Sequence, residues 1–216
     1  MLAMAAAAGN AQFFVEGSIG AQYWGQSSSF DGTATSQPSS HYLSISPLIG
    51  RRMNEKLALG VSASLVRRTE RYMTLDSNTG EEVLYERKTP GWNLSIFDRY
   101  TLWDKKKFSI LLESSFFFGA NNAIEKRGVT TLSNQIRTSI GVQAFPLILY
   151  DLSDRFSIRF SVDFLRLDLY ALIVNNKETG KKTKSAHFEL NGQSTILYSL
   201  GGFRIGIIYH FKKSDK

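Results

Sequence analysis

Apolar and polar residues alternate with a period of two along most of this chain. In the segment 156–164 every second residue is aromatic or aliphatic, and the residues between them are Ser, Arg or Asp. This period is typical of strands with one apolar face, and no segment shows a convincing helical period. The pattern predicts eight strands, centred on residues 13–23, 43–50, 57–65, 92–96, 108–119, 136–144, 156–164 and 203–211.

The connections between these segments alternate in length. Long polar stretches lie at about 26–40, 74–90, 120–134 and 175–195, whereas short turns lie at about 51–56, 103–107 and 151–155. A meander whose two ends face different surroundings has this arrangement, as in outer-membrane barrels with short periplasmic turns and long external loops. The chain is therefore predicted to be all-β, an eight-stranded antiparallel up-and-down transmembrane β-barrel over residues 12–211.

The two faces of the predicted strands differ in residue size. One face carries large apolar residues, and the other carries Ser, Gly and Ala with isolated charges, which suits a narrow barrel interior. Segment 57–65 stays apolar on one face for about the length that crosses a bilayer, and Arg67 follows it. Asp98 interrupts the apolar face, which predicts either a wet position or a local bulge. Aromatic girdles are expected near the short turns (Tyr100, Trp103, Phe108, Tyr150, Phe156, Tyr209, Phe211) and near the long loops (Tyr23, Trp92, Phe118, Tyr170).

Charged residues on the small-residue face are candidates for a site inside the barrel. Isolated buried charges are too costly, so these side chains must pair or be hydrated. A salt-bridge network that closes the lumen is the main interpretation, and a small gated or leaky pore is the alternative. The candidates are Glu16, Arg68, Arg99, Glu113, Arg137, Arg159, Asp163 and Arg204.

An internal repeat links two distant hairpins. Segments 47–62 (PLIGRRMNEKLALGVS) and 146–161 (PLILYDLSDRFSIRFS) align without gaps at an offset of 99 residues. The offset corresponds to four predicted strands, so duplication of a half-barrel would place the two hairpins on opposite walls. Convergence of two short-turn hairpins under the same constraints is the alternative.

Composition restricts the class of protein further. The 216 residues contain no Cys, which excludes disulfide scaffolds, Cys-based zinc sites and thiol catalysis. With a mean hydropathy of −0.17, no apolar run approaches the ~20 residues of a membrane helix. The net charge of +7 is spread over turns and loops, so nucleic acid is not an expected partner, whereas loop lysines can meet lipopolysaccharide headgroups. Residues 1–11 are expected to be the remnant of a signal peptide, and residues 212–216 a short polar tail.

Several segments resemble the outer-membrane β-barrel domain family of small Gram-negative surface proteins. They are 44–50 (SISPLIG), 54–60 (NEKLALG), 97–100 (FDRY) and 204–211 (RIGIIYHF). In architecture the chain is similar to OmpA-type and OmpX-type eight-stranded barrels. The resemblance implies an outer-membrane location and a last strand whose Tyr209 and Phe211 are read by the barrel-assembly machinery. We expect a monomer without cofactor. The family has no single activity, so a non-enzymatic envelope role with loop-mediated binding or minor solute permeation is expected.

Two other functions are compatible with parts of the sequence. Lipid-modifying barrels exist, of which lipid A deacylases are examples, and His41, Ser44 and Glu189 are a conceivable catalytic set. A soluble lipocalin-like carrier would use the same alternation with its apolar face turned inward. The histidine spacing gives no signal for a metal site.

Overall fold

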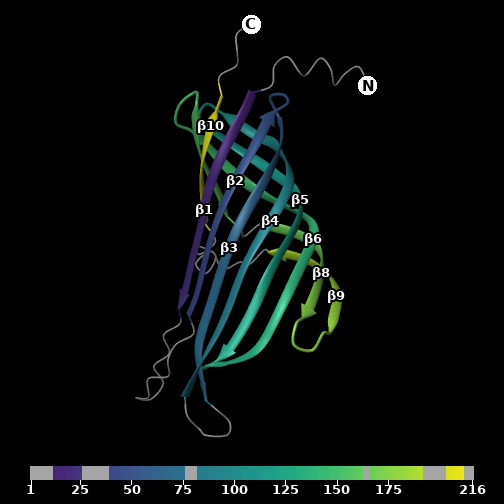
Figure 1. The fold of residues 1–216 in the computed structure, drawn as a ribbon. Helices are drawn as coiled ribbons and strands as arrows, with labels where there is room; N and C mark the ends of the chain where they lie inside the picture. Colours follow the sequence, from purple (N-terminus) through teal and green to yellow (C-terminus); the bar gives the residue numbers. More distant parts are fainter. Residues whose placement is uncertain (1–11, 26–38, 76–81, 163–165, 192–202, 212–216) are drawn as a thin grey trace.

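The computed structural model describes residues 12–25, 39–75, 82–162, 166–191 and 203–211, and the elements that it describes are all strands (Figure 1). Among these residues no helix is long and apolar enough to cross a membrane. The strands are β1 (Gln12–Gly25), β2 (Ser39–Arg52), β3 (Leu57–Leu75), β4 (Glu82–Lys105), β5 (Phe108–Arg127), β6 (Thr130–Asp151), β7 (Phe156–Val162), β8 (Arg166–Asn176), β9 (Lys182–Asn191) and β10 (Phe203–His210).

The strands close into an antiparallel ring of eight. Strands β1 to β7 pair in sequence order, and β10 lies between β7 and β1. Beyond the ring, β6 continues its pairing with β8, and β8 pairs with β9. The all-β, eight-membered up-and-down architecture expected from the alternation is thereby confirmed. Residues 1–11 and 212–216, expected to be a signal remnant and a tail, lie outside the described residues.

The connections differ from the expected ones at one end of the ring. Short turns at 53–56, 106–107 and 152–155 define what we call the short-turn end. At the opposite end, called the far end, the stretch 120–134 is not a loop, because β5 and β6 are joined by Gly128 and Val129 alone. Likewise β3 and β4 stay paired up to Leu75 and Glu82. The alternation of apolar and polar residues is weak in these stretches because the projecting strands carry polar residues on both faces.

Large apolar side chains point outward around the ring. We call this surface the outward belt. Its members are 40 to 67% exposed and include Phe13, Ile19, Leu43, Ile45, Ile49, Leu59, Val61, Leu65, Trp92, Leu94, Ile96, Phe116, Phe118, Ile140, Val142, Leu167, Leu169, Ile205 and Ile207. Exposed aromatics edge the belt at the short-turn end, where Trp103 meets Phe108 and Tyr209 meets Phe156 and Phe211. Toward the far end Trp92 packs edge-on against Phe118.

One residue departs from its expected face, and another keeps its face without the expected bulge. Tyr170 follows buried Asp168 at a spacing of two and therefore belongs to the inward face, so its assignment to an outer girdle is wrong. Asp98 does face outward, opposite Leu59 and Ser114. The irregularity in this part of β4 lies between Thr101 and Trp103, so a bulge does not change the phase at Asp98.

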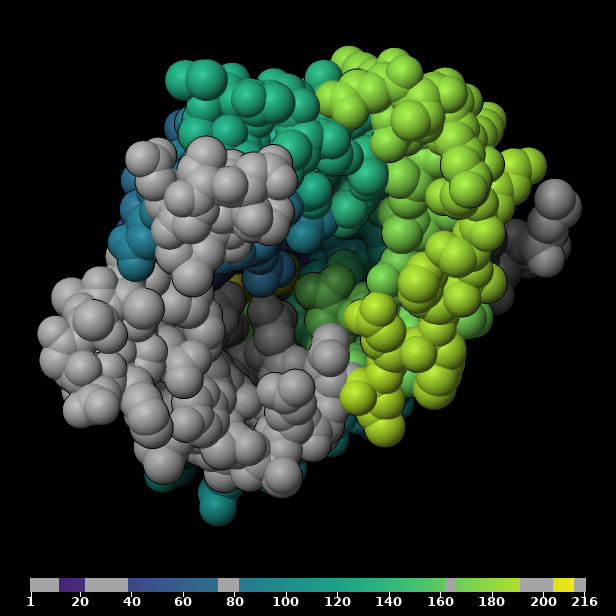
Figure 2. Space-filling model, turned by 90° about the horizontal axis from the view of Figure 1, so that it is seen from below, coloured from purple at the N-terminus to yellow at the C-terminus, as the bar shows by residue number. Residues whose placement is uncertain are grey.

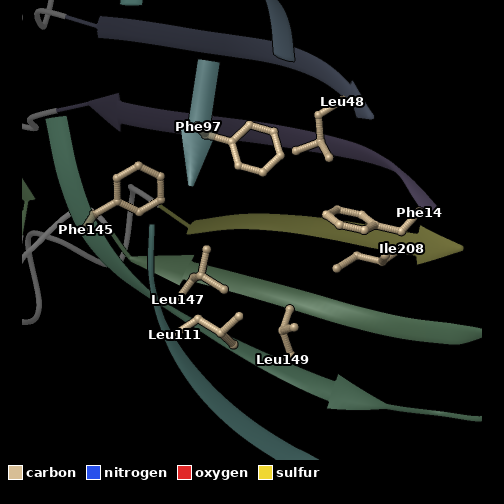
Figure 3. Close-up of a cluster of buried hydrophobic side chains, with 8 residues drawn as sticks. All are labelled: Phe14, Leu48, Phe97, Leu111, Phe145, Leu147, Leu149 and Ile208. Carbon is tan, nitrogen blue, oxygen red and sulfur yellow. The ribbon is translucent and has the colours of Figure 1, made fainter. Parts of the chain in front are cut away.

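The interior near the short-turn end is apolar, which the sequence pattern did not predict. Eight buried side chains from six strands point toward one another there (Figure 3). They are Phe14, Leu48, Phe97, Leu111, Phe145, Leu147, Leu149 and Ile208. Strands β5 and β6 supply four of them from runs such as 147–149 that are apolar on both faces, so alternation alone does not reveal them.

The repeated hairpins lie on opposite sides of the ring. Strands β2 and β3 are separated from β6 and β7 by two strands in each direction. Their registers match, because Leu48 pairs with Ser62 and Leu147 pairs with Ser161, each residue displaced by 99. Pro47 also faces a gap in the pairing of β2 with β3, at 46–47. The geometry that duplication requires is therefore present.

Glycines in the wall make room for the inward aromatic rings, which gives a test of this packing. A Cβ on Gly60 would collide with the Phe97 ring and with the Ile49 carbonyl, whereas a Cβ on Gly17 would meet nothing within 4 Å. Gly60→Ala should therefore lower the free energy of unfolding by about 1–3 kcal/mol through overpacking. Urea titration in detergent, followed by tryptophan fluorescence, measures this change. Gly17→Ala is the matched control, and equal effects of the two variants would contradict the packing.

Candidate functional site

Four of the predicted interior charges meet inside the ring. The Arg99 guanidinium lies with Nη2 2.8 Å from Glu16 Oε2 and with Nε 2.8 Å from Glu113 Oε2. Arg159 Nη1 lies 2.9 Å from Glu16 Oε1 and 3.6 Å from Glu113 Oε2. The four side chains come from β1, β4, β5 and β7, so this charge network joins the adjacent strands β4 and β5 to β1 and β7 across the lumen.

The charge network is closed to solvent and electrically balanced. Its side chains are 0 to 9% exposed. The Arg99 guanidinium also lies 5.0 Å from the centre of the Phe97 ring and 5.6 Å from that of Phe14, which are cation–π distances. Desolvating each ion costs several kcal/mol, and two carboxylates facing two guanidiniums offset that cost through short contacts. The network therefore forms a neutral crosslink through the middle of the lumen.

The other predicted interior charges lie outside this network. Arg68 pairs with Glu70 at 2.8 Å, near the far end. Arg137 is hydrogen-bonded to Gln135 on its own strand. Arg204 lies beside Gly20, where an added Cβ would come within 3.2 Å of its Cγ. Asp163 falls outside the described residues.

A polar vestibule occupies the lumen toward the far end. It has a volume of about 590 Å³, and its lining includes three arginines, a carboxylate and two asparagines, namely Arg68, Arg87, Arg137, Glu70, Asn93 and Asn121. Figure 2 shows the hollow from this end, between the wall formed by β3 to β6 and the wall that carries β8 and β9. Charged side chains of the lining such as Arg68, Glu70 and Arg87 are partly exposed, unlike those of the charge network.

Ion pairs on the extended strands hold the vestibule walls. Arg87 lies 3.8 Å from Glu70 and 3.3 Å from Glu125, so it connects β3, β4 and β5. Burial, followed by the hydrogen bond to Glu125, raises the pKa of Tyr85 to about 12, so this phenol stays protonated at neutral pH. The ion pairs keep the projecting strands together beyond the ring.

A second polar cluster closes the short-turn end. The Ser157 hydroxyl donates to Asp151 Oδ1 at 2.6 Å and lies 2.9 Å from His210 Nε2. Because its only proton points to Asp151, the hydroxyl must accept from His210. The histidine cannot then act as a base toward this serine, as a Ser-His-Asp triad needs. The cluster ties β6, β7 and β10 together beside a pocket of about 310 Å³ lined by basic and acidic residues.

The conceivable catalytic set does not form. His41 and Ser44 lie three residues apart on one strand and therefore point to opposite faces, with His41 exposed and Ser44 buried in the lumen. Glu189 lies on β9, where it accepts a hydrogen bond from Tyr170. Within the described ranges, no group of three or more His, Asp or Glu side chains is close enough to hold a metal ion.

Sequence reasoning missed several of the polar contacts. Asp151, Ser157 and His210 were not grouped, and neither were Arg87 and Glu125. The signal for Arg87 and Glu125 was present as inward parity, but both residues fall in stretches that were predicted to be loops. Continuing the period-two assignment of faces through 74–90 and 120–134 would have placed Arg87 and Glu125 on the inward face.

Comparison with known proteins provides no family. No protein-family model matches the chain, and no curated protein matches it. Among solved structures, a major outer membrane protein from Thermus thermophilus is 15% identical with a TM-score of 0.45, covering 94% of this chain and 100% of that one. Neisserial surface protein A is 12% identical with a TM-score of 0.38, covering 94% of this chain and 99% of that one. With identities this low and TM-scores below 0.5, neither likeness bears on the function of this chain.

The charge balance of the network predicts how its variants behave. Arg99→Met leaves Glu16 and Glu113 with a single guanidinium and should cost about 3–5 kcal/mol of unfolding free energy. Arg99→Met combined with Glu113→Gln restores neutrality, because the Glu16–Arg159 pair remains, and should recover roughly half of that loss. Urea unfolding of Arg99→Met, of Glu113→Gln and of the double variant, each compared with the unmodified chain, completes this double-mutant cycle. Strictly additive losses would show that the four groups are not coupled.

Proposed function

We propose that this chain is a non-enzymatic, monomeric β-barrel of the bacterial outer membrane whose lumen is closed and whose far end faces the exterior. The observation that carries the proposal is the distribution of side chains, with the outward belt on the surface and Glu16, Arg99, Glu113 and Arg159 inside. A protein in water gains nothing from exposing a continuous apolar belt, whereas in hydrocarbon the belt is the favourable surface. A closed ring also leaves few backbone groups unpaired in the bilayer.

The same distribution disfavours a soluble carrier. A lipocalin-like protein turns its apolar face into the cavity and its charged face toward water. In this ring the arrangement is reversed over the whole belt. Of the described residues, those that line the vestibule beyond the apolar cluster are mainly polar or charged, so this hollow does not suit an apolar ligand.

The proposed orientation follows from the two ends. Short turns typically lie on the periplasmic side of outer-membrane barrels, and longer structures project outward. The strand extensions and the polar vestibule would then face the exterior, where they can contact soluble ligands or a partner. On this orientation Tyr209 and Phe211 lie at the periplasmic edge of the belt, where the barrel-assembly machinery would read them.

The charge network favours a closed barrel over a pore. An eight-stranded ring leaves little space beyond its side chains, and here that space holds the apolar cluster and the network. Permeation of small solutes would require the network to open, at the cost of separating buried ion pairs. Binding through the vestibule and extensions is therefore the surface role that we propose.

Membrane insertion and closure can be tested with one preparation. The refolded chain should require detergent for solubility, migrate differently on gels before and after boiling, and show no conductance steps in planar bilayers. Arg99→Ser combined with Glu113→Ser keeps the lumen neutral and removes part of the network, so this variant should show small conductance steps.

The outcomes separate the two parts of the proposal. Solubility without detergent would overturn the membrane assignment. Conductance by the unmodified chain, with normal heat-dependent migration, would overturn closure alone. The Gly17→Ala variant is a control for handling, because its added methyl group would contact no other described residue and would leave the lumen unchanged.

A further inference from the structure

A cluster of basic side chains lies on the outer wall, next to the belt at its far-end edge. Strand pairing places His41, Thr69 and Lys88 in one row across β2, β3 and β4. Arg67 and Arg71 flank Thr69 along β3 on the same outward face. Neighbouring strands of a sheet are about 4.8 Å apart, and residues i and i+2 of one strand are about 7 Å apart. Four basic groups therefore surround Thr69.

One carboxylate organises part of this basic cluster. Glu86 Oε1 lies 2.7 Å from Arg71 Nη2, and Glu86 Oε2 lies 2.6 Å from Lys88 Nζ. Hydrogen bonds from Lys88 and Arg71 lower the pKa of Glu86, so it stays ionised and bridges the two cations. Arg67 is exposed and forms no ion pair with any described residue. The cluster keeps an excess of positive charge, with Arg67 available to a ligand.

The basic cluster lines one part of an amphipathic groove. The groove has a volume of about 560 Å³ and is lined by Ala21, His41, Tyr42, Leu43, Arg67, Thr69 and Arg71. Leu43 is directly opposite Arg67 in the strand pairing, and Leu65 of the belt lies two residues from Arg67 along β3. Along β3, the outer surface thus changes from basic at Arg67 to apolar at Leu65, the next residue on the same face.

We propose that this groove binds a phosphorylated lipid of the outer leaflet, with a phosphate between Arg67 and Arg71 and the acyl chains over Leu43 and Leu65. The inference rests on the proposed function, because only an embedded belt places the groove at the lipid–water boundary. A lipid fits better than a soluble anion, since the basic groups border the apolar surface on the outside of the wall and not the vestibule. Arginine favours phosphate through paired donors on a planar group.

Binding of lipid A by the refolded chain in neutral detergent tests the site, with native mass spectrometry as the measurement. Phosphorylated lipid A should bind at least about 10-fold more tightly than its dephosphorylated form. Arg67→Gln combined with Arg71→Gln should remove most of that difference. Lys182→Gln combined with Lys184→Gln is the matched control, because it removes two cations from an exposed strand near the far end, and it should change affinity less than about 2-fold.

Each other outcome overturns the inference. Equal losses in the two double variants would mean that binding follows net charge and not this groove. Equal affinity for both lipid forms would remove the role of phosphate, and full competition by millimolar inorganic phosphate would show that the acyl chains contribute nothing. Heat-dependent gel migration, measured in the same samples, keeps the two proposals apart: a chain that inserts normally but lacks lipid selectivity contradicts the site alone.

Discussion

The pairing of Glu16, Arg99, Glu113 and Arg159 is the interaction on which the rest of this structure depends. A ring with an apolar exterior has to place its polar residues inside, where unpaired charges are too costly to keep. Two guanidiniums and two carboxylates within 2.8 to 3.6 Å meet that constraint and also join β1, β4, β5 and β7. The apolar outward belt is thus compatible with charged residues in the sequence because those charges pair inside the ring.

The lumen is layered along its axis. Near the short-turn end it holds Ser157 with its polar partners and the apolar cluster around Phe97. The charge network lies among these apolar side chains, with Arg99 against the rings of Phe14 and Phe97. The vestibule, lined in part by Arg87, occupies the far end. This arrangement separates a buried half from a half with partly exposed side chains, so residues that can meet a ligand lie apart from those that hold the ring together.

The sequence predicts a strand well where the two faces of that strand lie in different surroundings, and poorly where both faces lie in similar surroundings. Where β7 has lipid-type surroundings on one face and a lumen on the other, as at Phe156 to Ser161, alternation revealed both faces correctly. Where β5 and β6 are apolar on both faces, as at Leu147 to Leu149, alternation disappears and the apolar cluster was missed. Beyond the ring the strands carry polar residues on both faces, so the stretch 120–134 has the composition of a loop although it forms a hairpin. For the site, the alternation of faces identified Glu16, Arg99, Glu113 and Arg159 as inward-facing residues. It did not show which of them pair with each other, because contacts across a ring depend on strand tilt and register.

The ring closes between β1 and β10, segments that lie near opposite ends of the chain. Bringing together such distant segments has the largest loop-closure entropy of any step in the fold, so this seam has to be recognised among many possible alignments. A slip of one residue in β1 would turn Glu16 outward into the belt and leave Arg99 and Arg159 with Glu113 alone. The charge network therefore also favours the native register during assembly, because only the correct alignment of β1 places Glu16 where it can pair with Arg99 and Arg159.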